Sequence, residues 1–144
     1  MLKDLQNTVH VTQVIDPAVI TTDTDSDSVD LLEYYAVTFM VLVGESGDTL
    51  SGSVKIELEI EDSDDDSSFS DAADADVQGY VAGTNDGCFA VIDAAAEDDV
   101  VAIATYHGSA RYARCVINVT GTHTNGTPIG AIAIRHGADY LPAS

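Results

Sequence analysis

The sequence SVKIELEIE at residues 53–61 alternates aliphatic and charged side chains from its second position to its end. The aliphatic residues share one side: Val54, Ile56, Leu58 and Ile60. The charged residues share the other: Lys55, Glu57, Glu59 and Glu61. Because successive side chains of a β-strand point to opposite faces, this period of two predicts an antiparallel strand with one buried face and one solvated, acidic face.

Residues 35–43, YAVTFMVLV, alternate in the same way but are apolar at nearly every position. Tyr35 and Phe39 fall on one side of this segment, and Met40 and Leu42 fall on the other. Apolar side chains on both faces are typical of a strand that is covered on both sides. We therefore predict a central or interface strand here, with Tyr35 and Phe39 as candidate contacts with a partner.

Five further segments of strand-like composition are separated by residues that favour turns: 8–15, 87–93, 99–106, 111–120 and 128–136. Only residues 72–77 and 94–97 suit a helical turn. Short strands without a sustained helical period predict an all-β chain, folded as a single-domain antiparallel β-sandwich or barrel-like fold.

The start of the chain differs from the rest, because Leu2 and Leu5 stand in an otherwise polar stretch. We expect one β-domain over residues 1–144, in which residues 1–16 form an extended N-terminal arm and the first strand. Residues 17–144 form the sandwich body. The arm either folds back on its own sheet or adds a strand to the exposed sheet edge of a neighbouring subunit, and its two leucines are candidate contacts.

Charge restricts the possible partners. The chain has 25 Asp and Glu residues against 5 Lys and Arg, which gives a formal net charge of −20. Binding to a phosphate backbone requires clustered Lys and Arg, so nucleic acid is excluded as a partner. No stretch approaches the roughly 20 apolar residues of a membrane span, and we expect no membrane partner. Mutual repulsion of the acids also predicts that added salt raises the melting temperature.

Two Asp-rich runs, residues 23–30 and 62–71, contain the oxygen ligands that Ca²⁺ prefers. Neither run has the Gly and Glu of an EF-hand loop, because its sixth position is Ser28 or Ser67 and its twelfth is Tyr34 or Ala73. Asp and Ser are also favoured in ordinary turns. We predict no metal and no cofactor, and keep a calcium-dependent module as an alternative.

No catalytic motif frames the reactive residues. His107 and Ser109 lack the Gly-x-Ser-x-Gly context of a hydrolase, and no glycine-rich phosphate loop occurs between a strand and a helix. The sequence therefore predicts a protein that is not an enzyme. Cys88 and Cys115 lie among apolar or strand-forming residues, which favours buried free thiols over a disulfide.

The segment Arg111-Tyr112-Ala113-Arg114 is the one basic spot of the sequence, at the start of a predicted strand. Arg and Tyr are enriched at protein interfaces, and the guanidinium group pairs with carboxylates through two hydrogen bonds. Arg111, Tyr112 and Arg114 are therefore candidate contacts with a partner. The alternative is pairing with acids of the same chain.

Several motifs occur together over most of the chain: Leu2-Lys3-Asp4-Leu5, Val29-Asp30-Leu31, LEIEDSDD at residues 58–65, Asp74-Ala75-Asp76, YHGSARYAR at residues 106–114 and the tail from Arg135-His136-Gly137 to Leu141-Pro142. In this combination the chain resembles the head decoration, or capsid cement, proteins of tailed bacteriophages. The loop at residues 121–127 and the high negative charge depart from the family pattern.

The resemblance implies a structural virion protein that is made in the host bacterial cytoplasm and sits on the outer surface of the capsid. Such a protein binds the major capsid protein, bridges neighbouring subunits and stabilises the shell. It implies a homo-oligomer, for which a trimer at three-fold and quasi-three-fold positions suits the lattice. Two alternatives remain: a low-copy head-tail connector or tail component, and a calcium-dependent adhesion or carbohydrate-binding module.

Overall fold

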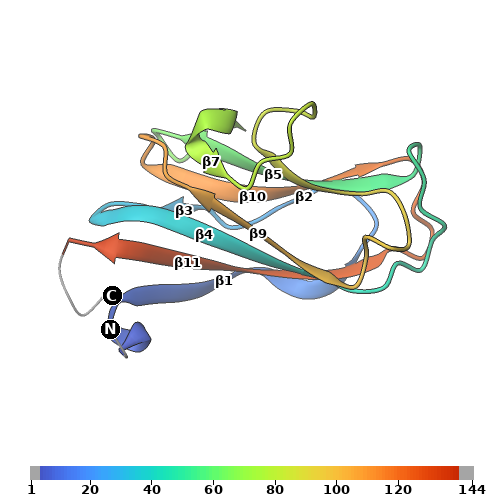
Figure 1. Cartoon of the computed structure of the whole chain (residues 1–144), viewed down its shortest axis with the longest axis horizontal. Helices are drawn as coiled ribbons and strands as arrows, with labels where there is room; N and C mark the ends of the chain where they lie inside the picture. Colours follow the sequence, from blue (N-terminus) through green and yellow to red (C-terminus); the bar gives the residue numbers. More distant parts are fainter. Residues whose placement is uncertain (1–3, 140–144) are drawn as a thin grey trace.

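The computed structural model describes residues 4–139 and consists of two antiparallel β-sheets packed face to face in a single domain (Figure 1). The first sheet has the order β1-β11-β4-β9-β7: β1 Val9–Ile20, β11 Thr127–Ala138, β4 Tyr34–Val43, β9 Val100–Tyr106 and β7 Val77–Gln78. The second has the order β2-β10-β5-β6: β2 Thr24–Asp25, β10 Tyr112–Thr120, β5 Lys55–Ser63 and β6 Ser70–Asp71. Two more strands join it, β3 Val29–Asp30 beside β10 and β8 Cys88–Ile92 beside β5.

The prediction of an all-β antiparallel sandwich is confirmed. Each strand expected from the sequence overlaps an observed one, and the helical turn expected at residues 72–77 is the 3₁₀ turn η2 Asp74–Asp76. The core lies between the two sheets, where the inward side chains of both interdigitate. Cys88 and Cys115 are buried free thiols, as expected.

The central strand β5 alternates as its sequence predicts. Ile56, Leu58 and Ile60 are fully buried against the first sheet. Its outer face differs from the expectation of a solvated acidic surface, because Glu59 is only 3% exposed. The side chains of Asn85 and Asn118 reach Glu59 from a neighbouring loop and from β10, and this cover explains the low exposure.

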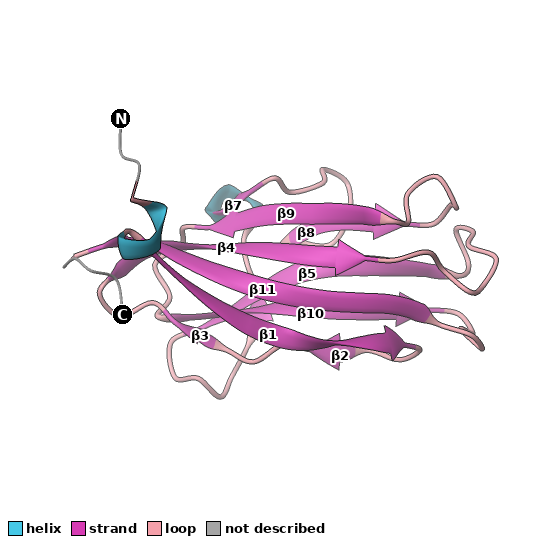
Figure 2. Ribbon diagram, turned by 90° about the horizontal axis from the view of Figure 1, so that it is seen from below, coloured by secondary structure: helices cyan, strands magenta, loops and turns pink. Residues whose placement is uncertain are grey.

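Strand β4 is covered on one face only. Val37, Phe39 and Val41 are fully buried in the sandwich, whereas Leu42 on the other face is 52% exposed. Figure 2 shows β1, β11, β4 and β9 side by side as the near layer, with β5 and β10 behind them. The expectation that both faces of this strand are covered is therefore wrong for the described chain, since the second sheet covers only the inner face.

Strand β1 is longer than predicted and continues through Asp16 and Pro17. Proline is tolerated there because β1 is an edge strand, and its pairing with β11 shifts register twice between Gln13 and Ala18. Residues 9–20 thus belong to the chain's own sheet. Before them lies the 3₁₀ turn η1 Leu5–Asn7, which has no buried residue.

A hydrogen bond between buried Tyr106 and half-buried Asp62 joins the two sheets at one end. The Tyr106 hydroxyl of β9 donates to Asp62 Oδ2 of β5 at 2.8 Å and accepts from the Ala110 amide at 3.2 Å. Gly108 is required beside it, because a Cβ there would lie 2.4 Å from the Tyr106 oxygen. Burial raises the pKa of the Tyr106 hydroxyl, which therefore stays protonated and acts as the donor. Burial also raises the pKa of Asp62, so the charged form of this carboxyl group is less favoured than it is in water.

Candidate interaction face

The outward side chains of β1, β11, β4 and β9 form a continuous apolar surface, which we call the apolar face. Its members are Val11, Val19, Ile132, Ile134, Met40, Leu42, Val101 and Ile103. Strand register aligns them in rows, so that Met40 lies between Ile132 and Ile103, and Leu42 lies beside Val101. No Asp, Glu, Lys or Arg occupies an outward position of β11, β4 or β9 in this region.

The exposure of this face is high for apolar side chains. Val11, Leu42, Val101 and Ile103 are each between 52% and 53% exposed, and Val19 is 58% exposed. Large exposed apolar patches on a protein surface mark sites that contact another molecule. In a chain with a net charge of −20, outward positions without charge are a specific feature of β11, β4 and β9.

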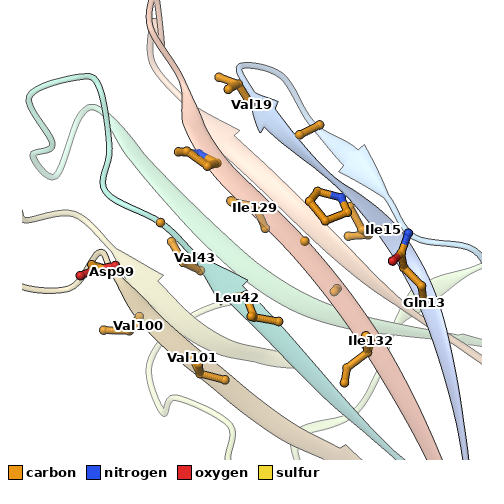
Figure 3. A pocket seen from close by; sticks show the side chains of 16 residues that line it. Gln13, Ile15, Val19, Leu42, Val43, Asp99, Val100, Val101, Ile129 and Ile132 are labelled. Carbon is orange, nitrogen blue, oxygen red and sulfur yellow. The ribbon is translucent and has the colours of Figure 1, made fainter.

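A hollow of about 650 Å³ opens in the apolar face towards the end where β9 begins. Figure 3 shows Leu42 and Val101 on one side of it, Val19 on the other, and the strand that carries Ile132 between them. Gly130 and Gly44 line the hollow, and a proline ring packs against each of them: a Cβ would lie 3.1 Å from Pro17 Cγ at Gly130 and 3.2 Å from Pro128 Cβ at Gly44. Most of its lining is apolar, and Gln13 and Asp99 are the polar side chains that border it.

The other end of the apolar face is closed by polar groups that bond to one another. Thr38 Oγ1 lies 2.8 Å from Thr105 Oγ1 and 3.1 Å from His136 Nε2. These side chains satisfy each other across β11, β4 and β9. The polar end of the face therefore has its hydrogen-bond partners within the chain. The hollow and the rows of aliphatic side chains are the part that no other side chain of residues 4–139 covers.

The outer face of the second sheet, which we call the charged face, carries the polar side chains of β5 and β10: Lys55, Glu57, Glu59, Glu61, Arg114 and Asn118. Lys55 Nζ pairs with Glu57 Oε1 at 2.9 Å. Arg114 binds Glu61 Oε2 at 2.7 Å through Nε and Asp25 Oδ2 at 2.9 Å through Nη1, with its guanidinium carbon 4.3 Å from the Phe69 ring centre. The charged groups of this face are thus bound by one another.

Glu59 lies at the centre of the charged face. It accepts hydrogen bonds from Asn85 at 3.1 Å and from Asn118 at 2.6 Å. Burial raises its pKa above the ordinary value, and the neighbouring carboxylates of Asp71 and Glu57 raise it further. The two amide donors hold the carboxylate in place against these effects.

The basic segment predicted as a contact is engaged within the chain. Arg111 binds Asp30 with two hydrogen bonds of 2.9 and 2.7 Å, and its guanidinium carbon lies 5.0 Å from the Tyr112 ring centre. Arg114 is bound as described above. Internal pairing, the alternative to an interface role, is what the structure shows for both guanidinium groups, and a partner for Arg111, Tyr112 or Arg114 stays a prediction.

The apolar residues predicted as contacts separate into three groups. Phe39 is fully buried in the core, so the structure corrects its assignment as a contact residue: its side chain points towards the second sheet. Tyr35 and Leu5 are 75% and 70% exposed and remain accessible. Leu2 lies outside the described residues.

The aspartates of the two Asp-rich runs accept hydrogen bonds from other groups of the same chain. Asp65 accepts from the amides of Ser67 and Ser68, and the Ser68 amide is the main cause of the lowered pKa of Asp65. Asp23 accepts from the Val119 amide at 2.7 Å. Within residues 4–139, no group of three or more His, Cys, Asp or Glu is arranged to hold a metal ion.

Sequence reasoning missed the breadth of the apolar face. The sequence VVAIATY of β9 and the isoleucines of β11 indicate this face, because apolar residues occur on both sides of each strand. The sequence analysis predicts apolar side chains on both faces for β4 alone. The full apolar face follows from the sheet order, which places β11 and β9 beside β4 and β1 beside β11.

Comparisons with known proteins assign no family to this chain. No protein-family model and no curated protein sequence matches this chain. A chain in the structure of infectious bursal disease virus Gx strain is weakly similar, with 17% identity and a TM-score of 0.37, over 94% of this chain. This chain corresponds to 33% of that longer one. No helix within residues 4–139 is long and apolar enough to cross a membrane.

Proposed function

We propose that this chain is a structural virion protein that attaches to the outer surface of a tailed-phage head and bridges major capsid subunits. The apolar face makes the attachment, and the charged face points to solvent. The observation that carries the proposal is the division of one small sandwich into an open apolar face and an opposite face whose charges are internally bound. The resemblance of the sequence motifs to head decoration proteins supplies the setting.

The size of the apolar face supports attachment in many copies. Four strands span about 14 Å across, and the outward positions from Pro128 to His136 of β11 span about 27 Å, which gives roughly 400 Å². A stable one-to-one interface buries about 800 Å² on each partner. One such face therefore makes a modest contact, and contacts to more than one shell subunit, or association of copies into a trimer, would multiply it.

Co-sedimentation with phage heads that lack the protein tests this function. The purified chain should pellet with the heads at hundreds of copies per particle and should raise the temperature at which they rupture, because a ligand that binds only the assembled shell stabilises it. Six to twelve copies per particle would instead indicate a connector ring. A chain that stays in the supernatant at every concentration contradicts the proposal.

A further inference from the structure

We propose that the hollow in the apolar face receives an extended segment of another protein with the pattern basic-x-apolar-x-basic, whose central side chain is bulky. The inference rests on the proposed function for the identity of the larger partner. Binding of the segment itself can be tested without a phage head.

The centre of the hollow selects an apolar side chain. Leu42, Val19 and Val101 form its walls, and Pro17 and Gly130 line it between them. Its volume of about 650 Å³ lies within the range of ligand pockets, which is about 300–1,000 Å³. A bulky aliphatic or aromatic residue fits such a space, and burying it removes the apolar surface of both molecules from water.

One carboxylate borders the hollow, and a second is bonded to the lining residue Gln13 on β1. Asp99 borders it where β9 begins, held there by its left-handed backbone (φ 52°) and by a hydrogen bond of 3.3 Å from its amide to the Gly44 carbonyl. Asp16 lies on β1, next to Pro17 of the lining, and accepts a hydrogen bond from Gln13. None of the lining residues is Lys or Arg. The rim therefore favours a partner with positive charge.

The spacing of these acids matches the repeat of an extended chain. Strands β1 and β9 are separated by three strand spacings, about 14 Å. Side chains at positions i−2 and i+2 of an extended segment point to the same face and also lie about 14 Å apart. A segment that crosses the four strands with residue i in the hollow thus brings basic residues at i−2 and i+2 to Asp16 and Asp99.

A second copy of this chain does not offer such a segment from its described residues. Lys55 is paired with Glu57, Arg111 with Asp30, and Arg114 with Glu61 and Asp25. Arg135 donates to the Asp30 carbonyl and contacts His10. A second copy would bring more negative charge to an acidic rim, so the occupant is a different protein.

NMR titration of the full ¹⁵N-labelled chain tests the site with a capped peptide, Thr-Val-Lys-Thr-Phe-Thr-Lys-Val-Thr. We expect amide shifts confined to β1, β11, β4 and β9, with a Kd below about 1 mM. One control peptide replaces Phe by Ala, and another replaces both Lys by Glu. Each control should bind at least about tenfold more weakly, because it removes the apolar anchor or reverses the charge.

Protein variants locate the site. Leu42→Asn should weaken peptide binding by about tenfold, whereas Leu32→Asn should not, although Leu32 is 58% exposed and Leu42 is 52% exposed. Asp16→Asn combined with Asp99→Asn should weaken binding of the Lys peptide about fivefold. Asn tolerates the left-handed backbone at position 99, and Asp71→Asn on an exposed strand of the other sheet is the charge control.

Three outcomes overturn the inference: shifts outside these four strands, equal binding of the Glu peptide, or a concentration-dependent dimer that Leu42→Asn disrupts. The outcome also separates this inference from the proposed function. If the peptide binds as described but the chain does not co-sediment with heads, the site is supported and the proposed head binding is rejected. Undiminished co-sedimentation of the Leu42→Asn and Asp16→Asn/Asp99→Asn variants keeps head binding and rejects the site.

Discussion

Glu59 and Leu42 stand on the outer faces of two central strands, on opposite sides of the same sandwich. The glutamate is 3% exposed and the leucine is 52% exposed, which reverses the usual order of burial for these residue types. Glu59 is covered because Asn85 and Asn118 bond to it, and the neighbouring charges are paired in the same way. Leu42 is exposed because no part of residues 4–139 packs over β4 and its neighbours.

This difference in exposure shows which face of the sandwich already has its contacts within the chain. The charged face satisfies its own hydrogen bonds and ion pairs, so a partner there would have to replace contacts that already exist. The apolar face has no such contacts to lose, and covering it gains the free energy of removing apolar surface from water. An incomplete face on an otherwise well-packed domain is the property expected of an attachment surface.

The largest expected effect comes from placing a charge on the apolar face. Ile103→Asp lies outside the hollow and should lower the affinity for phage heads by about 100-fold, because docking would bury an unpaired carboxylate. Leu32→Asp, similarly exposed on a loop, should bind like the unchanged protein. Quantitative co-sedimentation measures both. Equal losses for the two variants would indicate that attachment does not depend on the apolar face.

A second effect concerns the stability of the charged face. Arg114→Ala removes the partner of Glu61 and Asp25 and should lower the free energy of unfolding by about 2 kcal/mol, because two carboxylates lose their charge-assisted hydrogen bonds. Arg114→Lys keeps the charge but lacks the planar guanidinium group, so its free energy of unfolding should lie between those of the unchanged protein and Arg114→Ala. Arg111→Ala should cost less, since its pair with Asp30 is more exposed. Urea denaturation measures these losses, and a larger loss of stability for Arg111→Ala than for Arg114→Ala would contradict this description.

A third effect is the response of the whole chain to salt. With 25 acids against 5 basic residues, repulsion opposes the compact state and is screened as the Debye length shortens from about 10 Å at 0.1 M to about 3 Å at 1 M. We expect the melting temperature to rise by about 4 °C between 0.1 and 1 M NaCl, equivalent to about 1 kcal/mol. Differential scanning calorimetry that shows no rise would mean that the paired charges already compensate for the repulsion.

The smallest expected effect concerns the buried glutamate of the charged face. The pKa of Glu59 is raised in the folded chain, so the folded state binds this proton more tightly than the unfolded state. Its contribution therefore destabilises the fold as pH rises from the ordinary glutamate pKa through the raised value. Glu59→Gln should remove this pH dependence, although its amide offers one acceptor oxygen where the carboxylate offers two to Asn85 and Asn118. Denaturation at pH 4 and pH 7 measures this dependence, and a Glu59→Gln variant whose stability changes between these pH values as much as that of the unchanged protein would contradict the prediction.

The fold was largely predictable from local patterns. The alternation from Val54 to Ile60 and the apolar run of β4 identified the two central strands, because burial imposes a period of two on each of them. The exposure of Glu59 and of Leu42 was not predictable in the same way. Which side chains cover an outer face depends on sheet order and on loops, as Asn85 and Asn118 show for Glu59, and neither is encoded in local periodicity.

The candidate site was predicted only in part. Leu42's strand was recognised as two-faced, but Phe39 was placed on the wrong side of it for a contact role, since both faces are equally apolar in sequence. Arg111 and Arg114 were singled out by their charge, and their partners Asp30, Asp25 and Glu61 are distant along the chain. The hollow is lined by residues of separate segments, such as Pro17, Gly44 and Gly130, which the pairing of β1, β11 and β4 brings together.

Imaging of a decorated phage head, at a resolution that separates the two sheets, tests the central claim most directly. We expect β1, β11, β4 and β9 to face the shell, with density from another protein crossing the hollow beside Leu42, and the charged face of β5 and β10 to point to solvent. The opposite orientation, with Glu57 and Arg114 against the shell and the apolar face exposed, would contradict it.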